Sequence, residues 1–193
     1  LDKLGITDKV RLVPIELTEF SNVNTVLRQE KFDYIYNLAA QSYVAGSFEF
    51  PHLTSEINYQ APLNILEVIK IEGLDCNFYQ ASSSEMYGDT LTHTQNEETP
   101  FSPTSPYAVS KAAAHYLGCI YRSSFDIKAS SGILFNHESE LRGRGFVTRK
   151  ITSELALIRE CDGPAVKIGN LSAFRDWGYS PDYVKGMIMV NEA

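Results

Sequence analysis

The sequence predicts an α/β fold in which a doubly wound parallel sheet carries helices on both faces. Short apolar runs rich in β-branched and aromatic residues alternate with longer stretches of helical period, which is the pattern of strand–helix–strand units. The run Tyr34–Leu38 is apolar almost throughout, as expected of a strand that is covered on both faces. With 193 residues, 44% of them hydrophobic, the chain suffices for one domain, or for a domain with part of a neighbour.

The elements follow in order from these patterns. The expected strands are Val10–Ile15, Tyr34–Leu38, Asn77–Ala81, Ala129–Phe135 and Ala165–Ile168. The expected helices are Asn22–Lys31, Thr54–Glu72, Tyr107–Phe125 and Thr148–Glu160. Pro62 lies inside the second helix, and because an interior proline kinks a helix, we expect a bend there or a helix that begins just before it. Residues Asp89–Ser105 show neither the helical nor the strand period, which predicts a long loop that is either functional or mobile.

Charge and cysteine content exclude several classes of function. The formal net charge is −7 and the pI is about 5.1, without a basic stripe, so neither nucleic-acid binding nor binding to an anionic membrane is expected. No apolar run approaches the roughly 18 residues of a membrane-spanning helix, and residues 1–12 contain no signal-peptide core. Cys76, Cys119 and Cys161 are widely spaced, which favours free thiols in the cytoplasm over disulfides or a metal site.

Polar side chains follow three of the predicted strands at the point where each strand ends. These segments are Asn37–Ser42, Ala81–Tyr87 and Phe135–Arg144. Ligands of open parallel sheets bind at the carboxyl ends of the strands. The sequence therefore predicts one cleft to which all three segments contribute.

Two groups of residues near this edge could carry chemistry. Tyr107 and Lys111 are four apart at the start of a predicted helix, and an ammonium beside a phenol lowers the pKa of the phenol from about 10 towards neutrality. A tyrosine in that position can act as a general base for an alcohol, although an ordinary pair on a helix surface has the same spacing. Ser82–Glu85 follows a predicted strand, where a hydroxyl and a carboxylate could polarise a substrate oxygen and exchange a proton. A serine-rich turn with a solvated Glu85 is the alternative for that segment.

Taken together, these strings resemble a known enzyme family. Asn37–Ser42 (Asn-Leu-Ala-Ala-Gln-Ser), Ser82–Gly88 (Ser-Ser-Ser-Glu-Met-Tyr-Gly) and the Tyr107/Lys111 spacing are similar to the extended short-chain dehydrogenase/reductase family of nucleotide-sugar enzymes. Within that family, Asn136–Ser139 (Asn-His-Glu-Ser) and Arg175–Gly178 (Arg-Asp-Trp-Gly) resemble the GDP-mannose 4,6-dehydratases. The resemblance implies a Rossmann-type fold, NADP as cofactor, GDP-mannose as substrate and a redox-neutral dehydration.

The resemblance also assigns roles to single residues. Tyr107 would be the base for the hydroxyl on carbon 4, Lys111 would hold it as a phenolate, Ser83 would bind the developing carbonyl oxygen, and Glu85 would carry the proton of the elimination. The cofactor contacts that the resemblance implies are Glu16, Leu17, Leu38, Ala39, Ala40, Gln41, Ser42, Tyr107, Lys111, His137 and Arg142. The substrate contacts that it implies are Ser83, Ser84, Glu85, Asn136, Lys150 and Arg175.

The resemblance further implies a division of the chain and an assembly. Residues 1–135 would form part of an NADP-binding domain with the catalytic residues, and residues 136–193 would contribute to sugar-nucleotide binding and the last elements of the Rossmann fold. The helices Thr54–Glu72 and Tyr107–Phe125 would pair with their copies in a homodimer, or in a homotetramer built from it.

The chain departs from the family pattern at several places. Glu16 and Ser172 stand where aspartates are usual, and Leu53 stands where a cofactor-contacting tyrosine is frequent. None of the 12 glycines forms the phosphate-binding Gly-x-x-Gly-x-x-Gly turn. We therefore expect a fragment that lacks that turn and the end of the substrate-binding region, and that binds the cofactor poorly alone.

Two alternative functions remain open from the sequence. A related nucleotide-sugar epimerase or UDP-glucuronate decarboxylase shares the Tyr107/Lys111 pair and can carry a glutamate at the position of Glu85. A non-catalytic Rossmann-like binding protein belongs to another class, but such proteins often lose the tyrosine or the lysine that this chain keeps.

Overall fold

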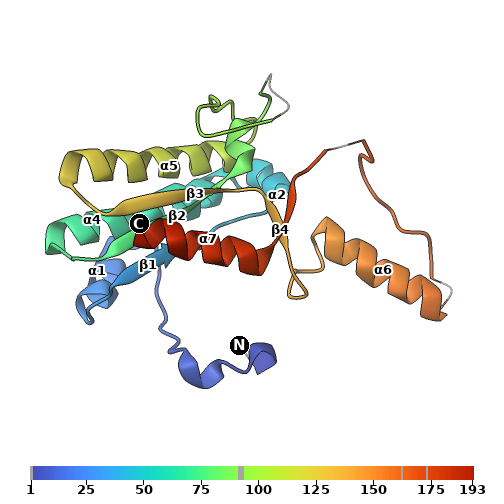
Figure 1. Ribbon diagram of the computed structural model, residues 1–193, viewed down its shortest axis with the longest axis horizontal. Coiled ribbons are helices and arrows are strands. Elements are labelled where there is room, and N and C mark those ends of the chain that lie inside the picture. The colour runs from blue at the N-terminus through green and yellow to red at the C-terminus, as the bar shows by residue number, and fades with distance from the viewer. Residues whose placement is uncertain (1, 91–93, 162, 173) are drawn as a thin grey trace.

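The central sheet has three parallel strands in the order β1-β2-β3. The computed structural model describes residues 2–90, 94–161, 163–172 and 174–193 (Figure 1). The strands are β1 (Tyr34–Asn37), β2 (Asn77–Ser83) and β3 (Ala129–Leu134). The pairing of β1 ends at Asn37 opposite Gln80, whereas β3 accompanies β2 to Ser83. A second parallel pair, β4 (Asn136–Glu138) and β5 (Trp177–Tyr179), continues from the carboxyl end of β3.

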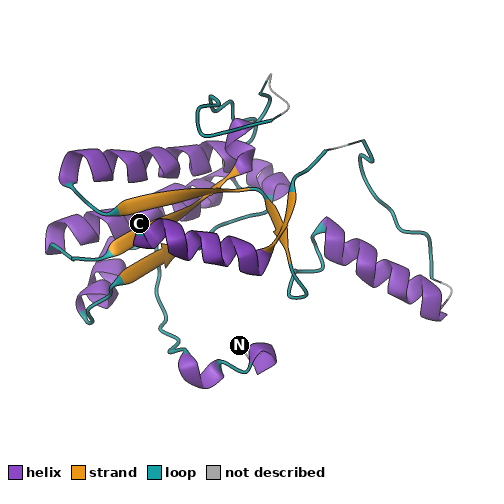
Figure 2. Cartoon of the chain, in the orientation of Figure 1, coloured by secondary structure: helices purple, strands orange, loops and turns teal. Residues whose placement is uncertain are grey.

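Helices cover both faces of this sheet, which confirms the doubly wound α/β class. On one face lie α1 (Phe20–Arg28), α4 (Ala61–Glu72) and α5 (Pro106–Phe125), and on the other lies α7 (Ser180–Glu192). Figure 2 shows the strands between these two layers of helices. The remaining helices are α2 (Val44–Glu49), α3 (Pro51–Ser55) and α6 (Val147–Cys161), and α6 stands apart from the sheet (Figure 1).

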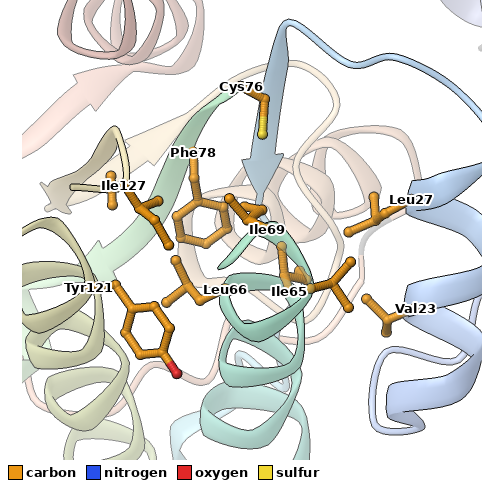
Figure 3. Close-up of a cluster of buried hydrophobic side chains, with 11 residues drawn as sticks. Val23, Leu27, Ile65, Leu66, Ile69, Cys76, Phe78, Tyr121 and Ile127 are labelled. Atoms are coloured by element: carbon orange, nitrogen blue, oxygen red, sulfur yellow. The ribbon is translucent and has the colours of Figure 1, made fainter. Parts of the chain in front are cut away.

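The main core lies between β2 and the helices α1, α4 and α5. Phe78 of β2 is fully buried there against Leu66 and Ile69 of α4, and Tyr121 of α5 closes one side (Figure 3). Because successive side chains of a strand point to opposite faces, Tyr79 lies on the other face, against Met187 of α7. Because of this alternation, the side chains of β2 contribute to the apolar packing on both faces of the sheet.

The predicted helix Thr54–Glu72 is interrupted. The chain forms α3, then a π-helical turn at Glu56–Gln60, and then α4, in which Pro62 occupies the first turn. The backbone is already helical at Gln60, and Ala61 N donates to Glu56 O, so the helical path runs on through the π-helical turn. Of the two expected outcomes, the regular α-helix does begin just before Pro62.

Two of the predicted strands are wrong. Residues Val10–Ile15 and Ala165–Ile168 are loops, and their larger apolar side chains, such as Leu12 and Ile168, are exposed. No strand among the described residues pairs with either segment, and an isolated strand leaves its backbone groups without partners.

Residues Asp89–Ser105 form the expected long loop, of which 91–93 lie outside the described residues. Across the described residues, every helix is too short or too polar to span a membrane.

Candidate active site

A cavity of about 650 Å³ lies at the carboxyl ends of β1, β2 and β3. Leu38, Ala40 and Ser42 line it after β1, and residues 81–85 line it at the end of β2. Residues 134–139 at the end of β3 and the amino-terminal part of α5 also line it. Further lining comes from the segment 141–147, Arg175, Trp177 and α7. The three strand ends therefore meet at one cavity, as the sequence predicts.

The start of α5 carries Tyr107 and Lys111 into this cavity. Ser105 caps the helix by accepting a hydrogen bond from Ala108 N at 3.1 Å, and Pro106 occupies the first turn. Residues four apart share one face of a helix, so Tyr107 and Lys111 both face the sheet. Their exposed fractions are only 8% and 3%.

Ser83 and Glu85 lie beside the Tyr107 phenol. Burial raises the pKa of Tyr107, a hydrogen bond with Ser83 lowers it, and the negative charge of Glu85 raises it again. The Ser83 hydroxyl also accepts a hydrogen bond from Glu85 N at 3.2 Å, which fixes the turn after β2. Three of the predicted catalytic side chains thus act on one another in this structure.

The expectation that Lys111 lowers the pKa of Tyr107 is wrong for this structure. The Lys111 ammonium lies 6.0 Å from the centre of the Tyr107 ring and donates a hydrogen bond to Ala81 O at 2.9 Å. The net shift of the Tyr107 pKa is upward because burial is its largest cause.

Lys111 is expected to titrate near pH 8, because burial disfavours the ammonium and lowers its pKa to about 8. An unfolded lysine keeps its proton up to a pKa of about 10.4, so the folded chain gains stability as the pH rises from about 8 to about 10. The Cε shifts of ¹³C-labelled lysines measure this titration. Exposed Lys128, whose pKa Asp75 raises, is the control, and a Lys111 titration above pH 10 contradicts the prediction.

Residues after β3 bring a cation and an imidazole to the opposite wall. His137 Nδ1 donates to Phe135 O at 2.8 Å, and its ring stacks on Tyr183 with the ring centres 4.8 Å apart. The Arg142 guanidinium lies 3.6 Å from the centre of the Phe146 ring. Its buried Nε is within 3.1 Å of a Glu138 carboxylate oxygen but is not aligned for a hydrogen bond. The Arg142 side chain is partly exposed and lines the cavity, where a guanidinium suits an anionic ligand.

Comparison with known proteins identifies the family of this chain. A sequence model described as GDP-mannose 4,6 dehydratase matches residues 1–193, the whole chain. The chain belongs to the GDP-mannose 4,6-dehydratase family. This result confirms the resemblance to the GDP-mannose 4,6-dehydratases that the sequence motifs indicate.

Curated relatives of this family come from distant organisms. The chain is 48% identical over 172 residues to a GDP-mannose 4,6-dehydratase of Vibrio cholerae, which covers 88% of this chain and 46% of that protein. It is 46% identical over 176 residues to GDP-mannose 4,6 dehydratase 2 of Arabidopsis thaliana, which covers 89% of this chain and 47% of that protein. The chain therefore spans about half the length of the relatives it matches.

Solved structures support the Rossmann-type fold. DesIV, a dTDP-glucose 4,6-dehydratase from Streptomyces venezuelae with NAD and TYD bound, has a TM-score of 0.85 at 22% identity and covers 98% of this chain and 57% of its own. RMD from Pseudomonas aeruginosa complexed with NADPH has a TM-score of 0.85 at 24% identity, and the match covers 93% of this chain and 61% of the RMD chain. At these identities the likeness concerns the fold.

Most of the residues that the family resemblance singled out line the cavity. They are Leu38, Ala40, Ser42, Ser83, Ser84, Glu85, Tyr107, Lys111, Asn136, His137, Arg142 and Arg175. Glu16, Leu17, Ala39, Gln41 and Lys150 are not among its lining residues. The Glu16 carboxylate accepts from the backbone and hydroxyl of Thr18, and the Lys150 ammonium donates to Lys167 O.

Asn58, in the π-helical turn, is a residue that sequence reasoning missed. Its Oδ1 accepts from Gln41 N at 2.9 Å, and its Nδ2 donates to Gln41 O and to Ser110 Oγ, each at 3.1 Å. Ser110 Oγ in turn donates to Tyr107 O at 2.7 Å. Asn58 thus joins the loop after β1 to the helix that carries Tyr107. Asn58 lies in a mostly polar segment four residues before Pro62, and nothing in that segment names these partners.

A second cavity, of about 600 Å³, adjoins the first. It shares Ser84, Glu85, Asn136 and Arg175 with the first cavity, and residues of the long loop, including Asp89 and Thr104, form another side. Glu85 therefore faces both cavities. The long loop contributes to the site, as its length and position in the sequence suggest.

Proposed function

We propose that this chain is the catalytic portion of a GDP-mannose 4,6-dehydratase, which converts GDP-D-mannose to GDP-4-dehydro-6-deoxy-D-mannose and water. One observation carries the proposal beyond family membership. Ser83, Glu85, Tyr107 and Lys111 lie together on one wall of a cavity of about 650 Å³, at the carboxyl end of the sheet. A base, a hydroxyl donor and a proton-carrying carboxylate are the groups that oxidation followed by elimination requires.

The oxidation at carbon 4 is assigned to Tyr107 and Ser83. Tyr107 Oη takes the proton of the carbon 4 hydroxyl while Ser83 donates a hydrogen bond to the oxygen that becomes the carbonyl. Lys111 contributes positive charge on the same face of α5. A bound nicotinamide supplies the acceptor for the hydride of carbon 4, a positive charge in its oxidised form, and the hydride that later adds to carbon 6.

The elimination across carbons 5 and 6 is assigned to Glu85. The ketone acidifies the proton on carbon 5, and the Glu85 carboxylate removes that proton and passes it to the hydroxyl leaving carbon 6 as water. With a nicotinamide bound, hydride return to carbon 6 would be matched by one proton at carbon 5, equivalent to the proton that Tyr107 took from the carbon 4 hydroxyl, so that Tyr107 and the cofactor would both end in their starting states. One carboxylate serves both ends of the elimination, which suits its place between the two cavities.

The cavity also fits a dinucleotide cofactor, which we propose to be NADP. Lys111 uses one of its donors on Ala81 O, which leaves others for ribose hydroxyls. Arg142 and His137 both line the cavity, and we assign the Arg142 guanidinium to a phosphate of the cofactor. We assign the loop Leu38–Ser42 to the cofactor as well, with Gln41 acting through its bonds to Asn58 and Thr54. Glu16 and Leu17 are assigned to the adenine.

We further propose how the rest of the chain takes part. Residues 1–135 hold the cofactor and catalytic groups, whereas Asn136, Lys150 and Arg175 of residues 136–193 contact the sugar nucleotide with Ser84. Val109, Tyr116 and Ile120 form an exposed apolar stripe on α5, which supports a homodimer through this helix. Free Cys76, Cys119 and Cys161 suit a reducing compartment such as the cytoplasm.

The test is incubation of the full-length protein that carries this chain with GDP-mannose and NADP. We expect a 4-keto-6-deoxy sugar nucleotide, detected by mass spectrometry as the loss of one water. UDP-glucuronate and a UDP-hexose are the parallel substrates for the decarboxylase and epimerase alternatives. Turnover of either one without turnover of GDP-mannose refutes the dehydratase, and sedimentation of the same preparation tests the dimer.

A further inference from the structure

Three side chains of α5, spaced four residues apart, hold the end of β2. Tyr107 bonds with the Ser83 side chain, and Lys111 donates to Ala81 O at 2.9 Å. His115 Nδ1 lies 3.0 Å from Ser82 Oγ. The spacing places all three on one stripe of the helix. Tyr107 and Lys111 belong to the proposed catalytic machinery, whereas His115 does not.

The surroundings of His115 fix its ring. Phe101 of the long loop meets the ring edge-on, with the ring centres 5.3 Å apart and the planes at 86°. Tyr116 also packs edge-on against the His115 ring at 6.0 Å, and it contacts Phe101 at 5.7 Å, so the three rings form one cluster. Burial and the charge of Arg122 lower the pKa of His115, so the imidazole is neutral at neutral pH. A neutral imidazole can either donate to the Ser82 hydroxyl or accept from it.

Ser82 is the residue through which this contact reaches the site. Its side chain is buried, and a buried hydroxyl without a partner costs free energy. Ser82 and Ser83 are adjacent at the end of β2, so an anchor on the Ser82 side chain restrains the backbone from which the Ser83 side chain projects. Ser83 is the side chain that must point at Tyr107.

We propose that His115 is a positioning residue for the dehydratase reaction, which holds Ser82 and thereby orients Ser83 towards Tyr107. This inference rests on the proposed function, because it assigns a purpose to the orientation of Ser83. His115 acts through Ser82 and touches neither the substrate nor the cofactor. Its effect is therefore expected in turnover more than in substrate binding.

Two substitutions separate the hydrogen bond from the packing of the ring. His115→Phe keeps an aromatic ring against Phe101 and Tyr116 but loses the nitrogen, whereas His115→Asn keeps a polar group near the position of Nδ1 and loses the ring. In the full-length protein with GDP-mannose, we expect H115F to lower kcat about tenfold with KM within about twofold. We expect H115N to stay within about threefold of the parent kcat. If H115F keeps the parent kcat, or if H115N loses as much as H115F, the proposal is overturned.

Ser82→Ala tests whether the effect passes through Ser82. We expect S82A to lower kcat about as much as H115F does, and the double variant to be no slower than either single one. Multiplicative losses in the double variant would show independent roles and overturn the proposal. Thermal melting of each variant checks that it is folded.

An NMR measurement keeps this inference separate from the proposed function. The ¹⁵N shifts of His115, assigned through H115N, report the hydrogen bond at Nδ1 without any turnover. We expect S82A to shift the Nδ1 resonance and to leave that of His137, which bonds Phe135 O, unchanged. An unchanged His115 resonance in S82A overturns the proposal. A different outcome is that S82A shifts the His115 Nδ1 resonance as expected but the parent protein does not turn over GDP-mannose. The hydrogen bond between His115 and Ser82 would then stand, while the dehydratase assignment and the purpose proposed for that bond would be refuted.

Discussion

Replacing Tyr107 with Phe is expected to lower kcat with GDP-mannose by about 10²- to 10⁴-fold in the full-length protein. The phenol is the proposed base, and Tyr107 as a whole is buried in the cavity wall, so Phe retains the packing and removes only the oxygen that takes the proton. The bond with Ser83 is lost as well. The rate of formation of the 4-keto product measures the effect, while KM is expected to change little.

Tyr34→Phe is the matched control for this experiment. Tyr34 lies on β1, is half-exposed, and stacks on Tyr36 with a ring-centre distance of 6.4 Å, far from the carboxyl end of the sheet. We expect it to keep the parent kcat within about twofold. If Tyr107→Phe also keeps the parent kcat, Tyr107 is not the base and a non-catalytic role for this fold gains support.

Replacing Gly88 with Ala is expected to destabilise the chain by about 3 kcal/mol, which is large for a single methyl group. Gly88 has φ +50° and ψ −126°, a combination that side chains with a Cβ rarely adopt. An added Cβ would lie 1.8 Å from Ser102 O and 3.2 Å from Pro103 Cα. The loop cannot easily retreat, because Ser102 N donates to Met86 O at 3.0 Å. Urea denaturation followed by circular dichroism measures the loss.

Gly186→Ala provides the control for the glycine prediction. Gly186 lies within α7, and an added Cβ would meet no atom within 4 Å. Alanine favours the helix, so this variant is expected to be more stable by about 0.5 to 1 kcal/mol. If Gly88→Ala has the same free energy of unfolding as the parent, the prediction is wrong. The long loop then moves away from the added Cβ, and the turn after β2 does not depend on the position of that loop.

Local patterns predicted the elements that form the centre of the fold. The apolar runs at Tyr34–Leu38, Asn77–Ala81 and Ala129–Phe135 became the three paired strands, and Tyr107–Phe125 became the long helix α5. The same patterns failed at Val10–Ile15, because a strand requires a neighbour with which to exchange hydrogen bonds, and no local pattern reports one. They also missed β4, β5, α2 and α7, whose sequences lack a clear period.

For the candidate site, the sequence by itself determined which residue types meet at the carboxyl edge of the sheet. Strand ends of parallel units share one edge, so Ser83, Glu85, Tyr107 and Lys111 follow from topology and motif spacing. Only the tertiary structure decided the environment of each group. Burial reversed the expected shift of the Tyr107 pKa, and contacts between distant segments revealed Asn58 and His115. The physical reason is that periodicity and spacing are local properties, whereas desolvation and hydrogen-bond partners arise only when distant segments pack together.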